Sequence, residues 1–227
     1  MFRQACLTVK ECVYGVACST PLEGNRANFS TGTGFMIAPG ILATCAHMVH
    51  MECNTGRPTH QTFQVIRAPD IGQALETSQL IAEDIGKDIA LLRIEHPRPR
   101  STQSLTLEHD ILEIGMSCGA LGFPLSGMTP TGLFALLLRF QGAYISAHII
   151  EPLPDGGSWE YYETDSLMYN GSSGCPLFTT NGHVFAMQSK VRTPQPNQQS
   201  QTDRFAISIC VPSPQIIAFA QANQIDV

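Results

Sequence analysis

Short apolar or alternating runs recur along the chain between clusters of turn-forming residues. Such runs are typical of β-strands, and their recurrence predicts an all-β barrel architecture. The candidate strands before a linker at about residues 97–104 span residues 12–19, 34–38, 41–44, 62–67, 74–83 and 89–95. Those after it span residues 115–121, 132–140, 144–150, 161–165, 176–178, 184–191 and 205–211. About six strands on either side of the linker is the number that two packed barrels require.

A single helix is predicted, at the C-terminus over residues 213–224. Ser213 is a favourable N-cap residue, and Pro214 is a favourable first helical residue. Ile216 and Phe219 belong to an apolar face, which we expect to pack against the second barrel.

The turn at residues 170–176 reads Asn-Gly-Ser-Ser-Gly-Cys-Pro. Gly171 and Gly174 enclose Ser173 and allow the backbone to bend sharply and to bring its N–H groups close to a ligand. A nucleophilic serine needs this setting, an exposed hydroxyl with free amides beside it. Alone the turn is weak support, because turns rich in Gly and Ser are common.

Two upstream residues are suited to activate such a serine. His47 is expected just past the end of a buried strand, and Asp88 opens a strongly apolar strand that begins at Ile89. A buried acid is costly unless something pairs with it, and a histidine N–H is a natural partner. Taken alone, His47 could be a core or surface residue, and Asp88 could cap a strand or pair with Lys87.

The order His47, Asp88, Ser173 is one of the three chain orders in which a Ser-His-Asp constellation occurs. Ser172 lies one place early relative to a Gly-x-Ser-Gly pattern, so Ser173 is preferred as the nucleophile. Asp84 is the nearby competitor of Asp88, but the apolar strand begins directly after Asp88.

In register, these motifs resemble the trypsin-like serine proteases of the chymotrypsin fold, and most of all the Deg/HtrA-type bacterial proteases. The matching stretches are residues 31–35, 41–47, 88–94, 122–124, 164–165, 171–177 and 206–213. The resemblance implies two packed six-stranded antiparallel β-barrels with a C-terminal α-helix. Residues 1–100 would form the barrel with His47 and Asp88, and residues 101–227 the barrel with Ser173. The peptide-binding module that usually follows in Deg-type proteins is not expected.

The resemblance implies a serine endopeptidase that needs no cofactor and acts through an acyl-enzyme. His47 would take the proton of Ser173 and return it to the leaving amine, and Asp88 would orient the imidazole. The backbone N–H groups of Gly171 and Ser173 would form the oxyanion hole. Cys175 stands where the family usually has a second glycine. We expect it to be packed and inert, with an oxidation-sensitive support of the turn as the alternative.

Substrate specificity is implied only by the resemblance. The walls of the pocket for the P1 residue, which precedes the scissile bond, would be Leu167, Met168, Tyr169, Met187, Gln188, Ser189 and Ile207. Leu167 stands where enzymes specific for Arg or Lys carry an acid. We therefore predict a small or medium apolar P1 residue such as Ala, Val, Leu or Met. The edge from Gln188 to Lys190 would bind the substrate backbone by strand addition, flanked by the loop of residues 192–204.

Composition limits the kinds of partner that we expect for this protein. The net charge is −6 and no strong Lys/Arg cluster is present, which argues against a nucleic-acid partner. Neither an N-terminal apolar run nor a stretch of membrane-spanning length is visible, so we expect no signal peptide and no membrane partner.

The cysteines indicate the compartment. Met48 follows His47, where the secreted relatives carry a bridged cysteine, so we expect reduced thiols and a cytoplasmic protein. Cys45, His47, His50 and Cys53 resemble a metal-ligand set, but their spacing does not match the usual zinc signatures. No metal is predicted.

Two alternatives stay open beside an active protease with protein or peptide substrates. One is a protease-like module that binds peptides or a protein with little or no turnover. The other is a latent enzyme that an activating protein partner switches on. Met1-Phe2-Arg3 is unlike the apolar pair that inserts into secreted digestive proteases on activation, so control would then fall on a bound protein or on ordering of the nucleophile turn.

Overall fold

The structure, a computed structural model, describes residues 1–24, 26–51, 58–98, 102–128, 134–152, 156–192 and 207–227. Six strands from the first part of the chain close into an antiparallel barrel in the order β1-β2-β3-β6-β5-β4. They are β1 (Val13–Leu22), β2 (Arg26–Ala38), β3 (Ile41–Thr44), β4 (Thr62–Arg67), β5 (Glu76–Asp84) and β6 (Ile89–Ile94). Closure leaves the ring without a free edge, so its strands pair with a neighbour on either side.

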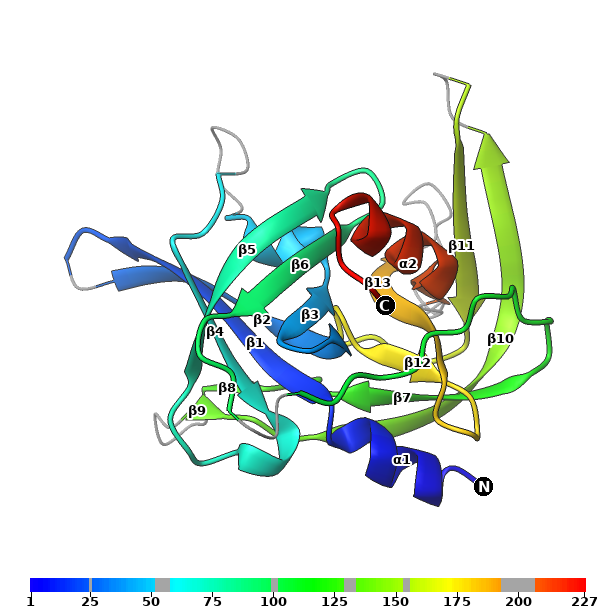
Figure 1. The fold of residues 1–227 in the computed structure, drawn as a ribbon, viewed down its shortest axis with the longest axis horizontal. Helices are drawn as coiled ribbons and strands as arrows, with labels where there is room; N and C mark the ends of the chain where they lie inside the picture. Colours follow the sequence, from blue (N-terminus) through cyan, green and yellow to red (C-terminus); the bar gives the residue numbers. More distant parts are fainter. Residues whose placement is uncertain (25, 52–57, 99–101, 129–133, 153–155, 193–206) are drawn as a thin grey trace, which may run out of the picture.

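A second antiparallel ring follows in the order β10-β11-β14-β13-β12-β7. Its strands are β7 (Ser117–Gly122), β10 (Arg139–Pro152), β11 (Ser158–Thr164), β12 (Pro176–Phe178), β13 (Val184–Arg192) and β14 (Ile207–Pro212). Two short strands, β8 (Gly127–Met128) and β9 (Phe134–Ala135), form a separate two-stranded sheet. The barrels lie side by side, and the β10–β11 hairpin projects beyond the second one (Figure 1).

The main apolar core spans both barrels, and a smaller second core lies within the second barrel. The buried side chains of the main core come from β1, β2, β3, β4 and β6 and also from the second barrel, for example Phe178, Met187 and Val211. Helix α2 (Ser213–Ala222) contacts β13 and β14 and adds Ile216 to this core. Helix α1 (Arg3–Lys10) contacts β7. Because the barrels share their core, their relative position is set by packing.

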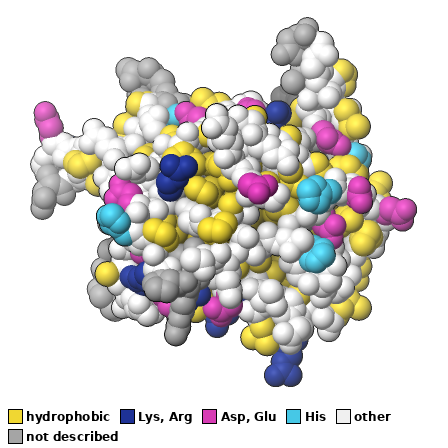
Figure 2. Space-filling view, in the orientation of Figure 1, with side chains coloured by type: hydrophobic (Ala, Val, Ile, Leu, Met, Phe, Trp, Pro, Cys, Tyr) yellow, Lys and Arg dark blue, Asp and Glu magenta, His cyan; other side chains and the backbone are white. Residues whose placement is uncertain are grey.

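No helix of the described part of the chain has the length and apolar character needed to cross a membrane. Lys and Arg side chains are few and spread apart on the face shown in Figure 2.

The predicted all-β class, the two barrels and the C-terminal helix are confirmed. Three strands, Ile41–Thr44, Thr62–Arg67 and Pro176–Phe178, have the predicted bounds. The proposed division between residues 100 and 101 lies outside the described residues.

The predicted strand at residues 132–140 is wrong over most of its described part. Phe134–Ala135 pairs with Gly127–Met128 rather than with a barrel, and only Arg139 and Phe140 join a barrel strand, as the start of β10. The apolar run was read as a barrel strand, but Leu136 and Leu138 pack against the shared core without joining the sheet. Tertiary packing overrides the local pattern here.

One helix was not predicted, and the other begins with a different N-cap residue from the one predicted. Helix α1 was not predicted, because no side chain caps its N-terminus and its apolar face is short. Helix α2 begins at Ser213, with Pro212 in the N-cap position. The Ser213 hydroxyl donates to the carbonyl oxygen of Glu108 at 2.5 Å and so anchors the helix to the segment before the second barrel instead of capping it.

A buried ion pair lies at the end of β4. Arg67 is 2% exposed, and its guanidinium donates to Asp70 twice, at 2.8 Å from Nε and 3.2 Å from Nη2. Nη1 donates to the half-exposed Glu11 at 3.1 Å and ties the end of α1 to the first barrel. A buried cation that loses its main partner is strongly destabilising, whereas an exposed partner contributes little.

We therefore expect Asp70→Ala to lower the free energy of unfolding by about 3 kcal/mol, and Glu11→Ala to lower it by about 1 kcal/mol or less. Urea unfolding of the two variants and the wild type at pH 7 measures both values. Equal losses in the two variants would contradict this assignment of the pair.

Candidate active site

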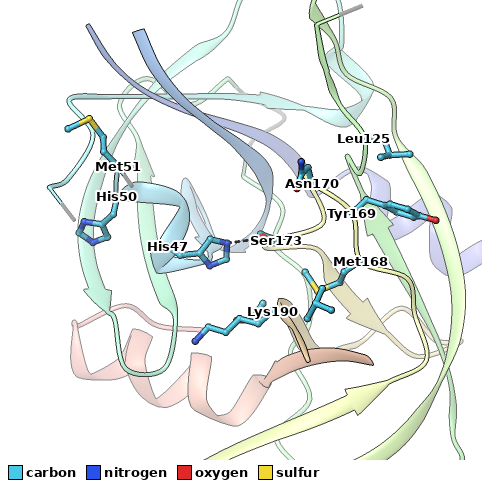
Figure 3. A pocket seen from close by; sticks show the side chains of 11 residues that line it. His47, His50, Met51, Leu125, Met168, Tyr169, Asn170, Ser173 and Lys190 are labelled. Atoms are coloured by element: carbon cyan, nitrogen blue, oxygen red, sulfur yellow. Dashed lines mark hydrogen bonds between the residues drawn. The ribbon is translucent and has the colours of Figure 1, made fainter. Parts of the chain in front are cut away.

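Three loop-borne side chains meet between the barrels. His47 lies in a 3-10 turn (Ala46–Val49) directly after β3, Asp88 precedes β6, and Ser173 lies in the turn before β12. His47 Nε2 is 2.9 Å from Ser173 Oγ, and His47 Nδ1 is 2.9 and 3.0 Å from the two carboxylate oxygens of Asp88 (Figure 3 shows the first contact). The structure thus brings together the three residues that the sequence selected.

Asp88 is 3% exposed and has a left-handed backbone with φ of +60°, a conformation that Asp tolerates better than most residues. Its carboxylate also accepts the backbone N–H of His47 at 2.9 Å and the hydroxyl of Ser189. Burial alone would raise the pKa of Asp88, but the hydrogen bonds and charge of His47 and the hydroxyl of Ser189 outweigh burial and lower it.

An ionised carboxylate only accepts hydrogen bonds, so His47 Nδ1 carries a proton toward Asp88. The lone pair of Nε2 then faces the hydroxyl of Ser173, which donates to it. This is the arrangement in which a histidine can take the hydroxyl proton as oxygen attacks an electrophile.

The turn around Ser173 depends on its glycines. Gly171 has φ of +94°, and a Cβ there would lie 2.3 Å from the carbonyl oxygen of Phe123. The N–H groups of Gly171 and Ser173 have no hydrogen-bond partner among the described residues. Ser172 is buried and its Oγ accepts the N–H of Tyr169 at 3.1 Å, so this hydroxyl supports the turn while Ser173 reaches His47.

These groups open onto a cleft of about 670 Å³. It is lined by His47, His50, Met51, Leu125, Met168, Tyr169, Asn170, Ser173, Ser189, Lys190 and Val191 (Figure 3). Of the expected specificity residues, Met168, Tyr169, Ser189 and Lys190 are there.

Several expected pocket walls lie elsewhere. Leu167 is 54% exposed and does not line the cleft, and neither does Ile207. Met187 and Gln188 are buried. The side-chain amide of Gln188 donates to Ser166 Oγ at 2.8 Å and to Ser208 Oγ at 3.2 Å. Gln188 therefore supports the cleft from beneath.

Sequence reasoning missed cleft residues on the other side of the site. Leu125 belongs to a loop with no chemical motif, so only the fold could reveal it, whereas Asn170 opens the nucleophile turn and was detectable from the sequence. Val191 was detectable, because it continues the strand edge that the sequence selected at Gln188 to Lys190. The flanking loop of residues 192–204 lies almost wholly outside the described residues.

The described cysteines are all free thiols. Cys175 is buried beneath the turn, where burial raises its pKa to about 12 and its thiol lies 3.4 Å from Thr33 Oγ1. Such a thiol is protonated and unreactive at neutral pH, in line with the packed role expected for it. Cys53 lies outside the described residues.

Within the described ranges, Cys45, His47 and Asp88 are the one group whose potential metal-ligand atoms lie within 4.8 Å of one another. His47 and Asp88 already use these atoms for each other. Burial raises the pKa of Cys45 well above its usual value, which disfavours the thiolate that a metal needs. His50 pairs instead with Glu83 at 2.6 Å. The group does not offer a free ligand set.

Comparisons with known proteins agree with the family resemblance seen in the sequence. Residues 32–187 match the family model described as trypsin-like peptidase domain. The chain is 27% identical over 176 residues to serine protease HTRA2, mitochondrial, of Bos taurus, covering 74% of this chain and 33% of the relative. It is 26% identical over 204 residues to human serine protease HTRA3, covering 88% and 39%. The chain thus spans well under half the length of these relatives.

Two solved structures share the fold. The active form of the Rv3671c protease of M. tuberculosis superposes with a TM-score of 0.71 at 18% identity, covering 98% of this chain and 85% of that one. The HtrA-type protease AlgW with a tripeptide gives a TM-score of 0.73 at 18% identity, covering 98% and 63%. At these identities the likeness concerns the fold alone.

The lowered pKa of Asp88 links folding to pH. A carboxylate whose pKa is depressed in the folded state stabilises it above the unfolded value, here 3.8, and the stabilisation is lost as the pH falls through the folded value. We expect Asp88→Asn, which tolerates the same backbone conformation, to lower the free energy of unfolding at pH 7 by about 1–3 kcal/mol.

Urea unfolding at pH 7, 5 and 3 should show this deficit narrowing below about pH 4. Asp84→Asn serves as the control, because Asp84 is only partly buried and its carboxylate is 3.5 Å from Lys87. A deficit for Asp88→Asn that is the same at all three pH values would refute the linkage.

Proposed function

The chain belongs to the trypsin-like peptidase domain family, and we propose that it is a serine endopeptidase that acts through His47, Asp88 and Ser173. The observation that carries the proposal is the continuous hydrogen-bonded chain from the Asp88 carboxylate through His47 to the Ser173 hydroxyl. If these three residues served only as core residues, as a strand cap or as a surface ion pair, their hydrogen bonds would not need to end in a cleft beside free backbone N–H groups.

The proposed reaction begins with attack of Ser173 Oγ on the substrate carbonyl carbon while His47 Nε2 takes the hydroxyl proton. The carbonyl oxygen becomes an oxyanion and accepts the N–H groups of Gly171 and Ser173. Collapse of the intermediate breaks the C–N bond, and His47 returns the proton to the leaving amine. Water then attacks the acyl-enzyme by the same route and frees Ser173. Every proton transfer uses groups of the chain itself, so the reaction needs no cofactor.

A protein or peptide substrate fits the edge of β13. Strand β12 pairs with β13 only as far as Met187, while β14 pairs with its other edge through Arg192. Ser189, Lys190 and Val191 therefore line the cleft beyond the last pair with β12. This arrangement supports binding of an extended peptide by strand addition, with its scissile bond beside Ser173.

We further propose that the site is assembled without insertion of a new N-terminus. The Phe2 ring packs against Phe140 and Phe178, at centroid separations of 5.6 and 6.0 Å, rather than at the nucleophile turn. Residue 172 is a serine whose hydroxyl accepts a hydrogen bond within the turn. It is not an acid whose carboxylate would need the ammonium group of an inserted N-terminus as its partner. An enzyme that is latent until a partner binds, and a binding module with little turnover, are the competing outcomes of the experiment below.

Incubation with a fluorophosphonate probe tests the nucleophile. We expect covalent labelling of the wild type, with the adduct mapped to Ser173 by mass spectrometry, and none in Ser173→Ala or His47→Ala. Ser172→Ala should still acquire the label. No labelling of a folded wild type would remove the claim of constitutive activity, and labelling only after addition of a second protein would establish latency.

A peptide library with a varied P1 residue tests specificity. Met168 and Val191 line the cleft with apolar surface, and none of the described residues that line it is an acid. We expect cleavage after Ala, Val, Leu or Met, with Arg and Lys at P1 disfavoured about tenfold or more because the cleft offers no partner for a buried charge. The same library with Ser173→Ala is the control. A profile dominated by Arg or Lys would show that this pocket assignment is wrong.

A further inference from the structure

We propose that Thr33, on β2 of the first barrel, is a positioning residue for the oxyanion hole of the second barrel. This role rests on the proposed serine protease function. Thr33 is fully buried and does not line the cleft, and its hydroxyl bonds to Gly171 and Phe123 rather than to His47. It acts on the reaction only through the nucleophile turn.

The two proposed oxyanion donors belong to two peptide groups of that turn. A trans peptide points its C=O and its N–H in opposite directions, so holding the carbonyl aims the amide. The carbonyl of Asn170, opposite the Gly171 N–H, accepts the N–H of Leu125 at 2.7 Å. The carbonyl of Ser172, opposite the Ser173 N–H, accepts the N–H of Cys175 at 2.9 Å. Both donors are therefore turned away from these partners.

The peptide between them, Gly171–Ser172, decides whether the two donors converge. Its N–H donates to the carbonyl of Tyr169 at 2.8 Å, and its C=O accepts the hydroxyl of Thr33 at 2.9 Å. The backbone N–H of Thr33 also donates to the carbonyl of Ser173 at 2.8 Å. One residue thus holds the turn on both sides of Ser172, and it does so from the other barrel.

The hydroxyl of Thr33 also connects a third segment. It accepts the N–H of Phe123 at 3.0 Å while donating to Gly171. The loop that begins at Phe123 presents its own carbonyl against Gly171 and, two residues later, the Leu125 N–H that holds Asn170. Removing the hydroxyl would leave the N–H of Phe123 and the carbonyl of Gly171 without this partner at a buried position, where unpaired polar groups favour rearrangement.

The surroundings leave Thr33 little freedom. Its carbonyl accepts the hydroxyl of Thr44 at 2.7 Å. A Cβ at Gly122 would lie 2.7 Å from Thr33 Oγ1, and one at Gly174 would lie 1.9 Å from the Thr33 carbonyl oxygen. The two glycines thus clear the space in which this threonine reaches the turn, and serine is the other residue type that could make the same contacts.

The experiment compares Thr33→Val, which removes the hydroxyl at nearly constant volume, with Thr33→Ser, which keeps it. We expect the fluorophosphonate labelling rate to fall about 10- to 100-fold in Thr33→Val, since one lost oxyanion donor costs about 100- to 1000-fold in kcat. Thr33→Ser should stay within about threefold of the wild type. The pH midpoint of labelling should not move, because His47 and Asp88 are untouched.

Thr20→Val is the matched control. Thr20 is a buried threonine of the same barrel whose hydroxyl accepts the N–H of Gln61 and pairs with His60 instead of the turn. It should lose stability but keep its labelling rate well below its melting temperature. If Thr33→Val does not fold, Thr33→Ala carries the same prediction. A folded variant without the hydroxyl that labels at the wild-type rate overturns the inference.

A second readout separates failure of this inference from failure of the proposed function. Hydrogen exchange of the backbone amides in residues 169–175 should be faster in Thr33→Val than in Thr33→Ser by about tenfold. Should the wild type not label, either alone or with an added protein partner, the proposed function fails, and the exchange experiment still decides whether Thr33 orders the turn. Equal exchange in the two variants would overturn that role.

Discussion

Packing of the two barrels across one shared apolar core is the constraint on which the site depends. Ser173 belongs to one barrel, and its histidine partner, 126 residues earlier, belongs to the other. A 2.9 Å hydrogen bond between them exists only while the barrels keep their relative position. Close-packed cores resist small displacements, so burial of side chains such as Phe178 and Met187 is what holds the distance between distant catalytic candidates.

Polar contacts across the barrel interface are the second requirement. The hydroxyl of Thr33, the thiol of Cys45 and the hydroxyl of Ser189 each reach from one barrel to the other, to Gly171, Gln188 and Asp88. A buried polar group is costly without a partner, so each of these contacts disfavours any other arrangement of the interface. The apolar core stabilises the interface between the barrels, and these contacts fix how the barrels are oriented relative to each other. Together they connect the fold to the geometry of the cleft.

The errors of the sequence analysis share one physical cause. Residues 132–140 were assigned to a barrel because their apolar pattern is strand-like, yet Leu136 packs on the shared core from outside the sheet. Leu167 was placed in a pocket by the family resemblance, yet its side chain is more than half exposed. Gln188 was expected in the cleft and lies beneath it, paired with Ser166 and Ser208. Local pattern specifies what a residue prefers, and its neighbours in space decide where it goes.

The sequence by itself determined the strand class, the two-barrel arrangement through its resemblance, and the identity of the three polar residues that meet. The strand class and the three polar residues have local causes: alternating apolar positions, glycines where the backbone must be left-handed, and an acid too close to a buried strand to remain unpaired. Only the tertiary structure decided which side chains line the cleft and that Thr33 holds the nucleophile turn. Those relations are distances between segments far apart along the chain, and such distances arise from how the two barrels pack.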